Sequence, residues 1–179
     1  MSTTHPYPAG EHGGDDAALE AAGPGGAVRS DGAEAVRQIR RLRLVGTSGA
    51  VSRSREFARA ALHDWGWLPA ATDEARAAAE DALLVVSELV TNACLHANGP
   101  DELRLGCGPK VLRVEVSDRG SGLPAPDLAR RAGRPGGHGM FIVQRLCLDW
   151  GVAREAGPQD GSGAPRKTVW AELAAPTAP

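Results

Sequence analysis

Hydrophobic and polar side chains alternate in several short runs of this chain, and longer runs repeat their hydrophobic positions at helical spacing. Alternation is typical of strands with one buried face, and a repeat of three to four residues is typical of amphipathic helices. The alternating runs cover residues 39–46, 101–108, 111–118 and 167–173. We therefore predict four strands, the first of them a half-exposed edge strand because its alternate positions are basic.

Helical spacing occurs in three segments. Residues 52–67 have one apolar face, and Ser52 or Ser54 is the expected capping residue. Residues 72–97 predict a long helix, and residues 140–151 predict a short one. The segment that follows, up to the closing strand, is expected to be a loop or a ragged hairpin. This order of elements predicts an α+β fold, a two-layer sandwich with a mixed, mostly antiparallel sheet backed by helices.

Composition divides the chain unevenly. Residues 1–36 hold seven Gly, three Pro, six acids and one base, a net charge of −5, which predicts a disordered acidic tail. The remainder, with 16 acids and 19 bases, has a net charge of +3, too small to indicate direct nucleic-acid binding. We expect one ordered domain over residues 37–175 and a short tail over residues 176–179.

Cysteine usage and hydropathy suggest a cytoplasmic protein with no membrane partner. Cys94, Cys107 and Cys147 are widely spaced in apolar runs, so we interpret them as small buried hydrophobic residues of a reducing compartment. No apolar stretch approaches the length needed to span a membrane, and the N-terminus lacks the basic and apolar parts of a secretion signal.

A polar stripe runs along the predicted long helix in the sequence SELVTNACLHA. Glu88, Asn92 and His96 are spaced four residues apart and therefore share one side of the helix. Burying such groups without partners is unfavourable, so the stripe calls for a ligand or for solvent. For each residue taken alone a structural interpretation is open, with Glu88 as a half-buried acid and His96 as a satisfied helix-end histidine.

Two glycine-containing segments are further candidates. In VSDRGSGLP a strand ends on Asp118 and passes directly into Gly120 and Gly122, which fits either a simple turn or an acceptor beside open backbone. In RPGGHGMFIV a glycine-rich loop leads into a helix, which fits either a flexible loop or an anion site. The chain has no GxxxxGK[ST] phosphate loop, no third glycine of a dinucleotide-binding turn, and no GxSxG nucleophile elbow.

The combination of four motifs in order resembles the GHKL, or Bergerat-fold, ATPase superfamily. These motifs are a helix with Glu-x-x-x-Asn, a strand-end Asp-x-Gly-x-Gly, a Gly-x-Gly that opens a helix, and a last strand that begins Lys-Thr. The resemblance covers roughly residues 40–174. Within the superfamily the chain is most similar to the anti-sigma-factor serine kinases and their actinobacterial relatives. Relatives usually have a glycine just before the Lys-Thr or Thr of the last strand. Here Pro165, Arg166 and Lys167 follow a longer loop rich in glycine and proline instead.

The resemblance implies roles for these residues around ATP and Mg²⁺. It implies that Glu88 is the general base, that Asn92 coordinates Mg²⁺, and that His96 approaches the phosphates. It implies that Asp118 accepts a hydrogen bond from the adenine amino group, completed by Thr168 and a water molecule. It also implies that Gly120 and Gly122 leave space for the purine. The backbone N–H groups that it places at the phosphates are those of Gly137, His138, Gly139 and Met140. The lid arginines that it implies add positive charge are Arg130, Arg131 and Arg134.

Two functions from different classes remain open. The first is a serine/threonine kinase that sequesters a sigma factor and phosphorylates a small anti-anti-sigma protein of the STAS type. The second is an ATP-gated protein-binding module without kinase activity. We expect the anti-sigma type because no dimerisation helix pair precedes residue 72 and no transducer domain follows the ATPase segment. A homodimer is also expected from the resemblance, with the edge strand at residues 39–46 as a contact.

Overall fold

The computed structural model describes residues 38–120, 139–155 and 165–176. Within these residues the element order is β1, α1, α2, β2, β3, α3, β4, β5. The helices are α1 (Ala50–Asp64), α2 (Asp73–His96) and α3 (Gly139–Leu146). The strands are β1 (Gln38–Arg43), β2 (Pro100–Cys107), β3 (Val111–Asp118), β4 (Asp149–Glu155) and β5 (Arg166–Ala174). The acidic tail predicted for residues 1–36 lies outside the described residues.

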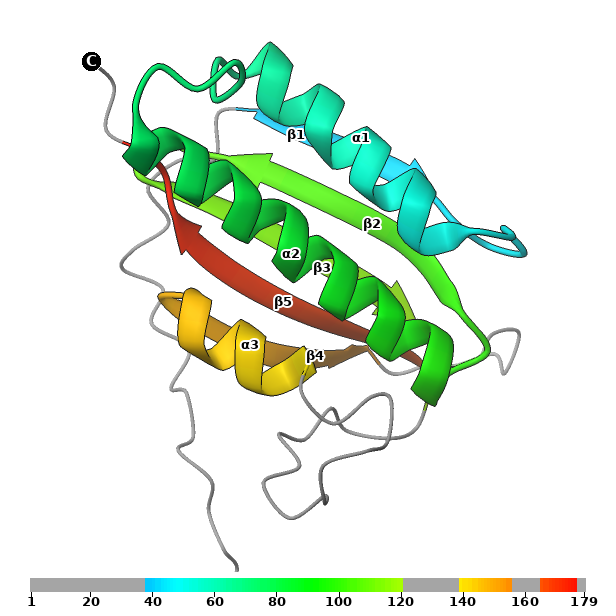
Figure 1. The fold of residues 1–179 in the computed structure, drawn as a ribbon. Coiled ribbons are helices and arrows are strands. Elements are labelled where there is room, and N and C mark those ends of the chain that lie inside the picture. The colour runs from blue at the N-terminus through cyan, green and yellow to red at the C-terminus, as the bar shows by residue number, and fades with distance from the viewer. Residues whose placement is uncertain (1–37, 121–138, 156–164, 177–179) are drawn as a thin grey trace, which may run out of the picture.

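The strands form one five-stranded sheet in the order β1-β2-β3-β5-β4. Every neighbouring pair is antiparallel, so the sheet is antiparallel throughout rather than mixed. All three helices lie on the same face of the sheet (Figure 1), with α2 across its centre. The predicted α+β sandwich with two layers is confirmed, and β1 is an edge strand as its alternating basic residues indicated.

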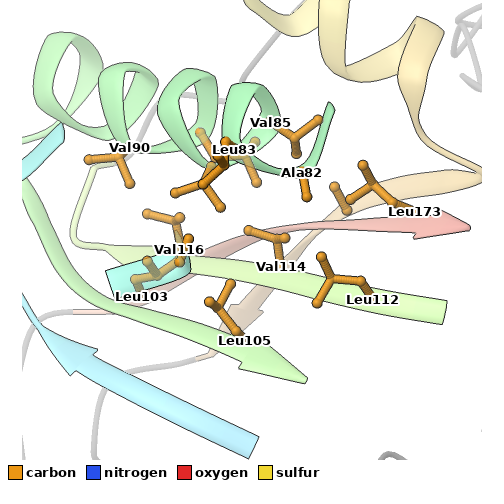
Figure 2. Close-up of a cluster of buried hydrophobic side chains, with 14 of the residues drawn as sticks. Ala82, Leu83, Val85, Val90, Leu103, Leu105, Leu112, Val114, Val116 and Leu173 are labelled. Atoms are coloured by element: carbon orange, nitrogen blue, oxygen red, sulfur yellow. The ribbon is translucent and has the colours of Figure 1, made fainter. Parts of the chain in front are cut away.

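The hydrophobic core fills the space between α2 and the sheet (Figure 2). Alternate positions of β2, β3 and β5 point toward the helices because successive side chains of a strand point to opposite faces. The fully or nearly fully buried side chains on these strands are Leu103, Leu105, Leu112, Val114, Val116, Val169, Ala171 and Leu173. From α2 they meet a set of small and branched side chains that includes Ala82, Val85, Leu89 and Val90.

The long helix α2 begins and ends where the sequence predicts. The Thr72 hydroxyl accepts a hydrogen bond from the backbone N–H of Ala75 at 3.1 Å, which satisfies one of the free donors of the first turn. Asp73 and Glu74 add negative charge at this end of the helix, where the helix dipole favours it.

The predicted cap of α1 is wrong. Neither Ser52 nor Ser54 caps the helix: it begins after Gly49, which is in the left-handed conformation with φ of 66° and makes no side-chain cap. Ser54 instead lies inside the helix, where it is completely buried and its hydroxyl has no partner among the described residues. A glycine can begin a helix without a side-chain signal in the sequence. The serines therefore placed the predicted start of the helix later in the chain than its actual start at Ala50.

The predicted helix over 140–151 is also wrong in its second half. The helix ends at Leu146, and the backbone N–H of Leu148 donates to the carbonyl of Glu172 at 2.7 Å, so the chain joins the sheet there. Residues 149–155 form β4, which makes a hairpin with β5, and the hairpin is the alternative that holds for this segment. Gly151 permits this pairing because a Cβ there would lie 2.8 Å from the Trp170 ring.

Ion pairs cover the face of the sheet that lacks helices. Arg104 and Arg113 both donate to Glu115, at 2.6 and 2.9 Å, and Arg113 also donates to Glu172 at 2.6 Å. The Arg113 guanidinium stacks over the Trp170 ring at 4.2 Å from its centroid. These contacts link β2, β3 and β5 on their outer face, which is therefore polar and needs no second layer of helices.

The three cysteines are free thiols, and only two are partly buried as expected. Cys94 of α2 is exposed. Burial, with the nearby negative charge of Asp81, raises the pKa of Cys147 to about 11. None of the helices in the described part of the chain is long and apolar enough to cross a membrane.

We predict that Leu103→Ala destabilises the fold by about 2–5 kcal/mol, since it opens a cavity beneath α2. Leu103 is 0% exposed. The free energy of unfolding from urea denaturation measures the effect. The matched control is Ile39→Ala on the edge strand, where the side chain is 46% exposed, and it should change stability by no more than about 0.5 kcal/mol. Equal losses in the two variants would contradict this description of the core.

Candidate functional site

The polar stripe of α2 runs along the side of the helix that faces α3 and the end of β3. Glu88 and Asn92, one helical turn apart, are both partly buried, and the Asn92 Nδ2 atom is buried without a hydrogen-bond partner among the described residues. His96 is the last residue of the helix and its side chain is exposed. The stripe therefore begins inside the fold and ends at its surface.

The carboxylate of Glu88 lies against the first residue of α3. An ideal Cβ placed on Gly139 would come within 2.5 Å of Glu88 Oε2, so the absence of a side chain at Gly139 makes room for this carboxylate. The next residue, Met140, is 5% exposed and points into the core. The start of α3 thus offers backbone, and no bulky side chain, beside Glu88.

Asp118 is the most deeply buried acid of the described residues, at 0% exposure. Its Oδ1 atom accepts a hydrogen bond from the backbone N–H of Gly120 at 2.7 Å and lies 3.3 Å from Lys167 Nζ. Its Oδ2 atom has no partner within the described ranges. A buried acceptor in this state costs about 1–3 kcal/mol unless a donor reaches it.

Gly120 brings the end of β3 into close contact with the end of α2. A Cβ at this position would lie 2.9 Å from both the Ala97 Cβ and the His96 carbonyl oxygen, and 3.0 Å from Asp118 Oδ1. Beside it is a polar hollow of about 410 Å³, lined by Leu95, His96, Ala97, Asn98, Arg119 and Gly120. The sequence therefore brings the helix end and the strand end together at one site.

Thr168 does not reach Asp118. In the β3–β5 register Thr168 pairs with Ser117, and the two hydroxyls share a hydrogen bond of 2.9 Å on the outer face of the sheet. Lys167 pairs with Asp118 on the face that the helices cover. The alternation of β5 carried this signal, since Lys167 has the same parity as the buried Val169 and shares its face.

The sequence interpretation also missed Arg55. Its guanidinium donates to the Ser87 hydroxyl at 2.7 Å, and that hydroxyl donates to the Leu83 carbonyl at 2.7 Å. Through these bonds α1 holds α2 at the residue directly before Glu88. No motif pointed to Arg55, because the contact joins positions 32 residues apart in the chain.

A second group that the sequence interpretation missed surrounds Asp101 at the end of the sheet near Asp118. Arg119 Nε lies 3.0 Å from Asp101 Oδ2, and Arg166 Nη2 lies 3.7 Å from the same oxygen. Asp101 is 8% exposed, whereas the two arginines are largely in solvent. These pairs tie the ends of β2, β3 and β5 together, and Arg119 also lines the hollow.

The remaining predicted residues lie outside the described ranges. These are Gly122, Gly137, His138 and the lid arginines Arg130, Arg131 and Arg134. Their implied contacts with the nucleotide stay predictions, as do those of Gly139 and Met140, which the structure places at the start of α3.

The described residues fit a purine nucleotide with a hydrogen-bond donor on its base and a magnesium ion near its phosphates. The Oδ2 atom of Asp118 is an acceptor without a partner among the described residues, and the end of α2 fills the space where a side chain on Gly120 would stand. The Asn92 Nδ2 donor has no partner among the described residues, so it could donate to a phosphate oxygen and leave the amide oxygen for a cation. Mg²⁺ prefers oxygen ligands and keeps several waters, so one amide oxygen is a sufficient protein contact.

Comparison with known proteins agrees with this geometry. The model of one family, the histidine kinase-like ATPase domain, matches residues 46–161, which include Glu88, Asn92, Asp118 and Gly120. The chain belongs to this family of ATP-binding domains. A search of curated proteins finds no match. The strands β1 and β5 lie outside the matched residues, and with β5 so does Lys167.

We predict that Gly120→Ala distorts the site. The added methyl group would overlap two backbone or helix-end atoms that cannot move aside easily, so the variant should lose about 1–3 kcal/mol of stability. Thermal or urea unfolding measures this. The control is Gly108→Ala in the β2–β3 hairpin, far from the hollow at the other end of these strands, which should have a smaller effect. A fully stable Gly120→Ala variant would show that β3 and α2 are not in contact there.

Proposed function

We propose that this chain is a protein serine/threonine kinase of the anti-sigma type, which binds Mg-ATP between α2, α3 and the end of β3. Two residues of α2 carry the proposal: the Glu88 carboxylate lies against the start of α3, and Asn92 lies one turn later with its Nδ2 donor buried and without a partner among the described residues. Membership of an ATP-binding family supports the nucleotide, and the intact acid one turn before the asparagine supports catalysis.

Each residue has a role that its chemistry allows. Bound Mg-ATP supplies the phosphoryl group and the positive charge that neutralises its oxygens. Asn92 would hold the metal through its amide oxygen. Glu88 would accept the proton of an incoming serine or threonine hydroxyl and orient that oxygen for in-line attack. Asp118 would accept from the amino group on the base through its free oxygen.

The proposed partners follow from the resemblance of the motifs to anti-sigma kinases. They are a sigma factor that the protein sequesters and a STAS-type antagonist whose serine or threonine is the phosphoryl acceptor. A homodimer through the edge strand β1 belongs to the same proposal. Co-purification with the products of adjacent genes tests these partners directly.

For Asn92→Ala we predict at least about tenfold weaker ATP binding in the presence of Mg²⁺, equivalent to about 1.4 kcal/mol of binding free energy. The fold should be nearly unaffected, because the side chain is only partly buried and the change removes no core packing. Isothermal titration with Mg²⁺ and then with EDTA measures both states. The defect should disappear in EDTA, and an unchanged affinity in Mg²⁺ would exclude Asn92 as the metal contact.

For Glu88→Gln we predict retained ATP binding and a loss of phosphoryl transfer of about 10²–10⁴-fold, the usual contribution of a general base. Transfer of labelled γ-phosphate to a purified STAS-type antagonist measures it. The matched control is Glu80→Gln, on an exposed position of the same helix, which should keep full activity.

The same pair of variants separates the kinase from the binding module. If Glu88→Gln still controls its partner as the unmodified protein does, the chemistry is dispensable and the ATP-gated module is the correct function.

A further inference from the structure

A second hollow, of about 380 Å³, lies between α1 and α2, which run side by side on the sheet (Figure 1). We call it the α1–α2 groove. On α2 it uses the first half of the helix, whereas the candidate nucleotide site uses the second half. Its apolar lining includes Ala79 and Leu83, which are almost completely buried, and Leu68, which is partly buried.

The charges of the groove favour a negatively charged occupant. Three guanidinium groups and one carboxylate line it, which gives a net charge of +2 from Arg55, Arg59, Arg76 and Glu80. Arg59 is exposed and makes no hydrogen bond or ion pair with another described residue. Arg76 pairs with Asp73 at 2.7 Å, but both side chains are exposed, and such surface pairs exchange partners at little cost.

Arg55 is held in the groove with donors to spare. Its Nη1 atom donates to the Ser87 hydroxyl at 2.7 Å and to the Leu83 carbonyl at 3.4 Å. These bonds fix the guanidinium between the two helices. A guanidinium has five N–H donors, and the Nε and Nη2 atoms of Arg55 have no partner among the described residues. The groove therefore presents oriented donors beside an apolar surface.

We propose that the α1–α2 groove is the docking site for an acidic segment of this chain's own N-terminal tail, residues 15–20, with the sequence DDAALE. This segment supplies three carboxylates, Asp15, Asp16 and Glu20, for the three guanidinium groups. Between them it supplies Ala17, Ala18 and Leu19 for the apolar lining. Hydrogen bonds between arginine and carboxylate are among the stronger ones in proteins. The docking is independent of nucleotide binding, and a docked tail excludes other acidic segments from the groove.

The tail enters the fold at the right end of the helical layer. It joins β1 at Gln38, and Arg40, two residues later, pairs at 2.5 Å with Asp64, the last residue of α1. Fully extended, residues 21–37 span about 55 Å. The longest helix, α2, has 24 residues and is about 36 Å long, so the segment can reach any part of the groove. Because it is tethered, it docks at an effective concentration on the order of millimolar, and weak contacts suffice.

The experiment compares the NMR spectra of the full chain and of the neutralised variant Asp15→Asn/Asp16→Asn/Glu20→Gln. The Nε–H and backbone amide signals of the groove arginines should differ between the two proteins, while the signals of β4, at the far edge of the sheet, should coincide. Identical groove signals in the two proteins would overturn the inference. The matched control in the tail is Asp31→Asn/Glu34→Gln, which should leave the groove signals unchanged. If this control moves them and the triple variant does not, residues 15–20 are not the occupant.

A change in the groove itself completes the test. Arg59→Gln removes one charge at an exposed position, so the fold should be unaffected. In this background the signal difference produced by neutralising the tail should shrink at Arg76 and Leu83. The matched control is Arg53→Gln, also exposed on α1 but outside the groove, which should leave the difference intact. Equal differences in the two backgrounds would show that the tail does not use Arg59.

Salt and dilution separate the remaining occupants. In about 1 M salt the Debye length falls to about 3 Å, so the signal difference should largely vanish, and its persistence would overturn a docking that depends on charge. Docking within one chain should survive dilution by about tenfold, because the effective concentration of a tethered segment does not depend on protein concentration. A difference lost on dilution would assign the groove to the tail of a second copy and overturn the inference as stated.

Discussion

The packing of α2 against the centre of the sheet is the constraint on which the rest of the structure depends. This helix contacts β2, β3 and β5 beneath it and α1 and α3 at its sides. Its branched side chains, such as Val85 and Leu89, are completely buried there. Turning the helix by one residue would expose that surface and bury Glu88 or Asn92 without partners, both of which are unfavourable. Hydrophobic packing therefore sets the direction in which the polar stripe points.

The candidate site combines a well-packed frame with polar groups that have no partner among the described residues. Arg55 bonds to Ser87 one residue before Glu88, and Gly120 ties the end of β3 to the end of α2. Within this frame the Asp118 Oδ2 and Asn92 Nδ2 atoms are buried and unpartnered among the described residues. The packing and hydrogen bonds of the surrounding frame offset the cost of leaving these atoms unpaired. Binding sites are commonly built in this way.

Much of the fold and part of the site could be predicted from the sequence, because they depend on local pattern. The α2 boundaries followed from Thr72 and the helical repeat, and Asp118 followed from a strand that ends before glycine. The errors arose where tertiary contacts decide. The helix expected over 140–151 gave way to β4 because Leu148 found a sheet partner in β5. The burial of Lys167 beside Asp118 depends on the strand register, which a motif of neighbouring residues does not give, while the implied role of Thr168 stays a prediction.

The ion pairs on the uncovered face of the sheet give its two sides opposite responses to ionic strength. The pairs among Arg104, Arg113, Glu115 and Glu172 are partly solvent-exposed, so dissolved salt screens them. The opposite side is held by apolar burial, which salts such as sulfate strengthen. One sheet thus has an uncovered face whose ion pairs weaken with added salt and a helix-covered face whose packing does not. A change of electrolyte would act on the ion pairs of the uncovered face of β2, β3 and β5, while the apolar packing of the same strands beneath α2 would not weaken.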